Sequence, residues 1–176
     1  MLWYLGDMER NKLFSLLMPP KSWKEAYGAK QELEESGQRQ AMVSFLLKKL
    51  ENTEESEIRN RAALILSDLK ELRAIDIIVK LLKSEKTQGK RGTLVYALEP
   101  FNNTALLPLL IDLVITDGWE ASREAFHLVE NMSGEIDEEV WDSCRAKIHI
   151  AIQSADEERM PLLEDLLMLF KGGENN

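Results

Sequence analysis

Cysteine and histidine are the residue types that most directly suggest a nucleophile or a transition-metal ligand, and this chain has three of them: Cys144, His127 and His149. Cys144 and His149 lie five residues apart on one predicted helix, which separates their side chains by about 140° around the axis. His127 falls on the preceding predicted helix. No paired-ligand motif, Gly-rich phosphate loop, Gly-x-Ser-x-Gly or dinucleotide fingerprint occurs. We therefore expect no catalytic site, no metal and no cofactor, and we expect Cys144 to be a core residue.

Carboxylates are the second group that could do chemistry, and they gather in one half of the chain. The net charge is -9. Residues 1–92 carry 17 Lys/Arg against 14 Asp/Glu, whereas residues 93–176 carry 5 against 17. Such a field repels a phosphate backbone and attracts cationic surfaces. We therefore expect no nucleic-acid binding and, if this half binds anything, a basic protein.

The acidic run 134–139 has the composition of a cation-binding loop but lacks the glycine and the spacing of an EF-hand. Carboxylates at the start of a helix also favour its dipole, which explains much of the run. The candidate partner-binding residues are Glu120, Glu124, Glu138, Glu139 and Asp142. A solvated surface that serves solubility is the favoured interpretation of these acids, and a binding face for a basic partner is the alternative.

Three arginines recur at one spacing: Arg59, Arg91 and Arg123 are each 32 residues apart. As structural residues they would form a ladder that pairs with acids such as Glu57, Glu120 or Glu124 and with loop carbonyls. As functional residues they would bind anions. We favour the structural interpretation.

The same offset relates aliphatic residues, which indicates an internal repeat. It carries Ala62 to Leu94 and Phe126, and Ile65 to Ala97 and Val129. An offset of 36 links the preceding residues to this unit, and an offset of 34 links the following ones. Repeats of this length that read as helix pairs bury their apolar faces by stacking.

Helix signals occur where these repeats need them. Ser22 to Glu25 reads as a capping box, and the segments 117–120 and 154–157 have a similar form. Gly37 and Gly134 are placed to end helices in a left-handed conformation. Strand signals are nearly absent. The pattern predicts helices near 22–36, 38–51, 57–71, 73–84, 87–100, 104–116, 119–132, 137–153 and 156–170.

The segment 1–20 stands apart because Pro19 and Pro20 stop any helix before them. We interpret it as an N-terminal capping segment, with a docking segment as the alternative. The repeat domain spans 21–171, and 172–176 is expected to be a disordered tail. The single cysteine, the absence of a secretory signal and the absence of a membrane-length apolar run predict a cytoplasmic protein.

The stretch Ile58–Leu66 resembles the first helix of a bacterial HEAT repeat, and Ala74–Leu82 resembles the second. The resemblance implies an all-α fold, a right-handed α-α superhelix: a short HEAT-like solenoid of about four helical hairpins with capping segments at both ends. It also implies an elongated surface lined by the second helices of each pair.

HEAT-like proteins are mostly scaffolds, adaptors and inhibitors, so the resemblance implies binding rather than catalysis. The first hypothesis is a scaffold or adaptor that holds a protein or peptide. The second is an acidic inhibitor or immunity-type protein that blocks a basic partner such as a nuclease toxin. The third is a repeat-built nucleic-acid-handling enzyme, which the acidic half disfavours. Trp119, Trp3 and Tyr4 are candidate interface anchors, although a tryptophan at a helix end can instead fold onto its loop.

Overall fold

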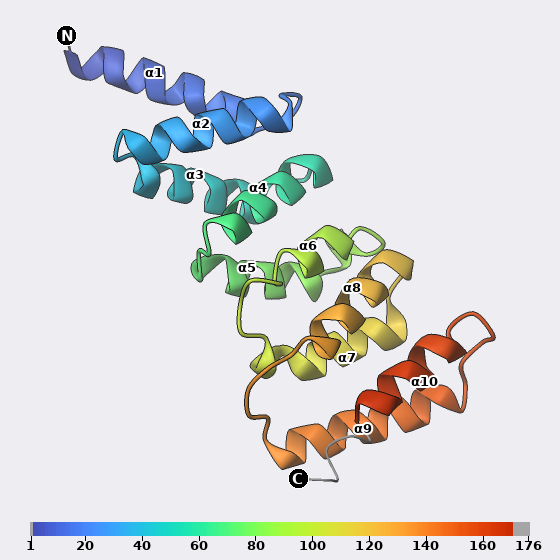
Figure 1. The fold of residues 1–176 in the computed structure, drawn as a ribbon. Helices are drawn as coiled ribbons and strands as arrows, with labels where there is room; N and C mark the ends of the chain where they lie inside the picture. Colours follow the sequence, from blue (N-terminus) through green and yellow to red (C-terminus); the bar gives the residue numbers. More distant parts are fainter. Residues whose placement is uncertain (1, 171–176) are drawn as a thin grey trace. The chain divides into compact units, whose positions relative to one another are not determined.

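The computed structural model describes residues 2–170, with side chains from Asp7 onward, and this part of the chain is helical without strands. It divides into two compact units, one ending at Ser84 and one beginning at Glu85. Figure 1 labels the helices of both. Each unit is described by itself.

The first unit consists of five α-helices joined by short turns. They are α1 (Leu2–Leu17), α2 (Trp23–Glu35), α3 (Arg39–Asn52), α4 (Ser56–Asp68) and α5 (Arg73–Leu82). Neighbours in sequence pack on one another, and α3 also packs on α5. Each helix of this unit therefore packs against the next one along the chain.

The start of α2 confirms the predicted capping box. Ser22 Oγ accepts a hydrogen bond from the Glu25 N–H at 3.2 Å, and the Glu25 carboxylate accepts one from the Ser22 N–H at 2.8 Å. The bond from the Ser22 N–H, and after it the one that the Ser22 hydroxyl donates to the same carboxylate at 2.8 Å, lower the pKa of Glu25. At the other end Gly37 has φ +73°, and the Gln38 N–H donates to the Leu33 carbonyl at 2.8 Å. The predicted glycine cap of α2 is therefore confirmed.

The first helix, α1, packs against α2 and contributes apolar side chains to the core. Leu13 and Leu17 are buried, and the ring of Phe14 stacks on Phe45 of α3 with centroids 4.8 Å apart. Trp3 and Tyr4 lie outside the side chains that the structure describes, as does the predicted tail 172–176.

The second unit contains shorter elements at its start and longer helices after them. They are two 3₁₀ turns, η1 (Glu85–Thr87) and η2 (Thr104–Leu106), and the α-helices α6 (Gly92–Tyr96), α7 (Leu107–Thr116), α8 (Trp119–Glu130), α9 (Glu138–Ile152) and α10 (Met160–Leu169). Here α8 packs on α6 and α7, and α9 packs on α7 and α10.

Some predicted boundaries in this unit are wrong. The helix expected over 87–100 is reduced to the five residues of α6, because Gly89 adopts a left-handed φ of +73° and Pro100 disfavours helical geometry at the residue before it. The last helix begins at Met160 instead of 156. Asp156 accepts from the Arg159 N–H at 2.8 Å, and Pro161 occupies the first turn of α10.

Two expected caps are also absent from their predicted places. The capping box expected over 117–120 does not form at the start of α8. The N-cap is Gly118, which has no side chain, and the Asp117 carboxylate pairs with Arg91 instead. Gly134 does have a positive φ of +122°, but it lies beyond the end of α8 at Glu130, in the loop that leads to α9.

The positions related by the 32-residue offset share their burial. Ala62, Ile65, Leu94, Ala97 and Val129 are all buried, and Phe126 is half-buried. This shared burial is consistent with an all-helical, repeat-like chain. None of the described helices has the length and apolar composition needed to cross a membrane.

Candidate functional site

Arg91 is held by an acid that the sequence did not single out. Its Nη1 lies 2.7 Å from Oδ2 of Asp117, and both side chains are largely buried. The other carboxylate oxygen accepts from the Gly118 N–H at 2.8 Å, and the Asp117 carbonyl accepts from Arg159 Nη2 at 2.6 Å. The acid that pairs with Arg91 is thus Asp117, not Glu120 or Glu124. This cluster ties the start of α6, the α7–α8 turn and the start of α10 together, which is a structural role.

The other two arginines of the series sit in different surroundings. Arg59 is 1% exposed on α4; its Nε and Nη1 have no hydrogen-bond partner among the described residues, and burial lowers its pKa. Arg123 is exposed, and its guanidinium lies 4.2 Å from the ring centroid of Trp119. One spacing therefore yields a buried, a paired and a surface arginine.

The five candidate acids lie on two helices that start at opposite ends of the second unit. Glu120 and Glu124 are near the start of α8, where α7 ends. The others, Glu138, Glu139 and Asp142, are exposed at the start of α9. A loop leads from the end of α8 to this place (Figure 1). Asp137 caps α9 by accepting from the Glu139 and Val140 N–H groups at 3.0 and 3.3 Å. The acids are thus split between two places, and those of the second place lie at a helix start, as the helix-dipole interpretation expects.

Cys144 is 2% exposed, which confirms it as a core residue, and burial raises the pKa of its thiol. His127 and His149 are exposed. Among the described residues no three Cys, His, Asp or Glu side chains come together as a metal-binding group.

Trp119 is 68% exposed at the first position of α8, so it does not fold onto the adjacent loop. Arg123, one helical turn further on, stacks on its ring. Beside it lies a hollow of about 250 Å³, whose lining includes Gly89, Gly92 and Gly118. A Cβ at Gly92 would lie 2.7 Å from the Cβ of Glu120, so this glycine lets α8 approach α6 closely. The result is a prominent aromatic ring beside a shallow cavity.

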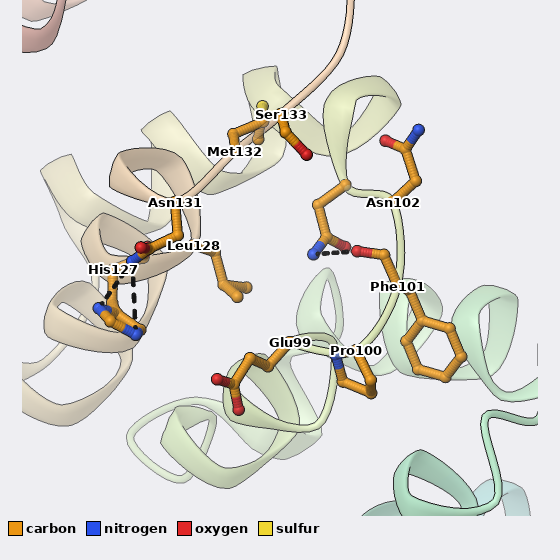
Figure 2. A pocket seen from close by; sticks show the side chains of 10 residues that line it. Glu99, Pro100, Phe101, Asn102, His127, Leu128, Asn131, Met132 and Ser133 are labelled. Atoms are coloured by element: carbon orange, nitrogen blue, oxygen red, sulfur yellow. Dashed lines mark hydrogen bonds between the residues drawn. The ribbon is translucent and has the colours of Figure 1, made fainter.

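A larger pocket, of about 310 Å³, lies at the other end of α8 (Figure 2). One wall is the segment from Glu99 to Asn103, after α6. The other is the end of α8 and the residues after it, with His127, Leu128 and Asn131. In Figure 2 the Leu128 side chain points into the space between the walls, while the Phe101 ring points away from it.

The polar groups of this pocket are largely fixed by hydrogen bonds. Asn103 is 6% exposed, and its Nδ2 donates to the carbonyls of Leu98 and Phe101 at 2.9 and 3.1 Å, but its Oδ1 has no partner among the described residues. Asn131 Nδ2 donates to the His127 carbonyl at 2.9 Å and lies 3.1 Å from that residue's ring. Two adjacent asparagines between predicted helices are the one feature of the sequence that could have indicated this pocket.

Comparison with known proteins adds no relative to this description. No family model matches the chain, and no curated protein matches it.

Proposed function

We propose that this chain is a protein-binding module that works without catalysis and holds a protein or peptide partner on the surface around Trp119. The observation that carries the proposal is the exposure of Trp119, which presents most of a large aromatic ring to solvent at the start of α8. Tryptophan and arginine are the residues that most often dominate binding energy in protein interfaces. Here the two are stacked on one another.

The stack also lowers the cost of binding. Arg123 is one turn along α8 from Trp119, so the helix fixes both side chains in one place before a partner arrives. Side chains that are already ordered lose less conformational entropy on association. The hollow lined by Gly92 and Gly118 gives a partner side chain somewhere to insert next to the ring.

We further propose that the hairpins form a short right-handed superhelix of the HEAT type in a cytoplasmic protein. The 32-residue offset, the shared burial of the positions it relates and the packing of successive helices support the repeat architecture. The single cysteine supports a reducing compartment.

Replacing Trp119 tests the binding surface. The tagged chain, its Trp119→Ala variant and an Ile150→Ala control are used to capture partners from cells that make the protein, with quantification by mass spectrometry. Ile150 is 67% exposed, so the control removes an equally exposed apolar side chain elsewhere in the same unit. We expect a partner to be retained by the native chain and the control and reduced at least about tenfold with Trp119→Ala, because truncating an interface tryptophan commonly costs about 2 kcal/mol or more. Equal retention by all three would refute the proposal.

An inhibitor of a basic protein is the second candidate, and the charge of the second unit favours it. Residues 85–176 carry 8 Lys/Arg against 18 Asp/Glu, a balance of -10. Exchanging Glu138, Glu139 and Asp142 for lysine would then slow association with the captured partner at low salt, since long-range attraction acts chiefly on the association rate. An unchanged association rate would exclude the inhibitor candidate, and the scaffold proposal would remain.

A further inference from the structure

We propose that the pocket between residues 99–103 and the end of α8 binds a guanidinium group, as an arginine side chain of the partner would present it. The inference rests on the proposed function, because it names a side chain that the bound protein or peptide contributes. The pocket is separate from the surface around Trp119: His127 lies eight positions after Trp119 on α8, which is about 12 Å along the helix.

The charge of the lining selects a cation. Glu99 supplies a carboxylate, and the lining contains no lysine or arginine to neutralise it. Glu130 lies just outside, with its Oε2 3.8 Å from Nδ1 of His127. In a unit with a balance of -10, an anionic ligand would be repelled from this place and a cationic one attracted.

The hydrogen-bonding groups select a ligand that donates in several directions. Asn103 Nδ2 is committed to two backbone carbonyls, and its Oδ1 is a buried acceptor that has no hydrogen-bond partner among the described residues. A buried acceptor left unpaired costs free energy, which a donor from a ligand would recover after a small local adjustment. Asn131 uses its Nδ2 on the His127 carbonyl, which leaves its Oδ1 as an acceptor. A guanidinium has five N–H donors in one plane and no acceptor, so it complements a carboxylate with amide oxygens around it.

The apolar part of the lining suits the stem of the same side chain. Pro100, Leu128 and Met132 contribute the apolar surface, against which the methylene groups of an arginine can lie while its head reaches the acceptors. A volume of about 310 Å³ is at the lower end of ligand pockets and fits one side chain rather than a large cofactor.

The test compares two ligands of the same shape that differ in charge. N-acetyl-arginine amide and N-acetyl-citrulline amide are titrated into the ¹⁵N-labelled full-length chain, and the shifts of the Asn103 and Asn131 side-chain amides are followed. We expect the arginine derivative to bind at this pocket and the citrulline derivative to bind at least about fivefold more weakly. A short peptide with one arginine is titrated in parallel. Tighter binding of the peptide than of the arginine derivative would assign the site to a protein partner, whereas equal binding would assign it to free guanidinium compounds.

Variants locate the binding and separate it from the surface around Trp119. Glu99→Gln should weaken the arginine derivative about tenfold and leave the citrulline derivative unchanged. Glu157→Gln, which removes another exposed carboxylate outside the pocket, should change neither. Trp119→Ala should leave probe binding intact, so a failure of the proposed partner surface would not be mistaken for a failure of the pocket. Equal affinity for both derivatives, or shifts that avoid Asn103 and Asn131, would overturn the proposal.

Discussion

Lys70 ends helix α4 in a conformation that suits glycine better than lysine. Its φ is +51°, and its N–H donates to the Ser67 carbonyl while the Glu71 N–H donates to the Leu66 carbonyl. This is the same pair of bonds that Gly37 makes after α2. At Gly37 the left-handed conformation meets no steric cost, whereas a side chain with a Cβ pays about 1 kcal/mol or more for it.

Lys70→Gly is therefore expected to raise the free energy of unfolding by about 0.5–1 kcal/mol, after part of the gain is offset by the greater freedom of glycine in the unfolded chain. Urea unfolding followed by circular dichroism measures it as a higher midpoint at unchanged slope. Gly37→Ala is the matched control and should lower the midpoint. A Lys70→Gly midpoint below that of the native chain would show that the lysine side chain stabilises the first unit in another way.

At the residue scale, burial and local capping could be predicted from the sequence, whereas the ion-pair and hydrogen-bond partners of side chains could not. Cys144 was expected in the core and is there, and the Ser22–Glu25 capping box depends on four consecutive residues that can be read directly. Arg91 was expected to be structural, but its acid lies 26 positions away at Asp117. Which acid pairs with Arg91 depends on how α6 and the α7–α8 turn pack, and the spacing of residues in one sequence does not predict this packing. The same holds for the unpaired oxygen of Asn103.

At the element scale, Gly92 decides how closely α8 can pack on α6. A methyl group at this position would lie 2.7 Å from the Cβ of Glu120 and 3.0 Å from its Oε2. The carboxylate can swing away, but the Cβ moves only if the start of α8 moves. Gly28, within α2, offers the opposite case, because an added Cβ there meets nothing within 4 Å.

Gly92→Ala is expected to lower the free energy of unfolding of the second unit by about 1–3 kcal/mol, since overpacking outweighs a helix-propensity gain of at most about 1 kcal/mol. Gly28→Ala should raise the stability of the first unit by about 0.5–1 kcal/mol. Hydrogen exchange of the amides of α8 and α2 reads the two units separately in one chain. Unchanged protection of α8 in Gly92→Ala would mean that α8 can shift without loss of packing. A shift of α8 would also move Trp119, which the assigned signal of its indole N–H in a ¹H–¹⁵N spectrum would report.

Helix existence was predictable and helix extent was not. Apolar periodicity placed every α-helix from α2 to α10, because the buried face repeats along each one. The extent differs most at α6, where the pattern predicted a helix over 87–100 but only five residues form the helix. The aliphatic residues Leu94 and Leu98 are buried as expected, but Gly89 and Pro100 limit the backbone on either side. Burial followed the pattern, whereas backbone geometry followed the glycine and the proline.

At the scale of the whole molecule, the charge asymmetry was visible in the sequence, and it also distinguishes the two compact units. The first unit carries 14 Lys/Arg against 13 Asp/Glu, and the second carries 8 against 18. The boundary between Ser84 and Glu85 could not be read from composition, because the repeat pattern runs across it without a break. Its position emerged from which helices pack together.

The two units should therefore respond differently to salt. In the second unit carboxylates outnumber Lys/Arg by ten, so their mutual repulsion opposes the folded state. The screening length falls from about 30 Å at 0.01 M salt to about 8 Å at 0.15 M. We expect sodium chloride over this range to slow hydrogen exchange of core amides in α7, such as Leu110 and Ile111, by several-fold. The amide of Leu46 in α3 should change little, because the first unit has a balance of only +1.

This comparison within one chain separates charge screening from a general effect of salt on apolar burial, which would slow exchange in both units alike. Equal slowing in α3 and α7 would mean that the acids of the second unit are too well solvated to repel one another. Selective slowing in α7 would mean that this unit holds unfavourable charge in its free state. A basic partner that covers those acids would then stabilise the second unit, because it would relieve the same repulsion between carboxylates that salt screens.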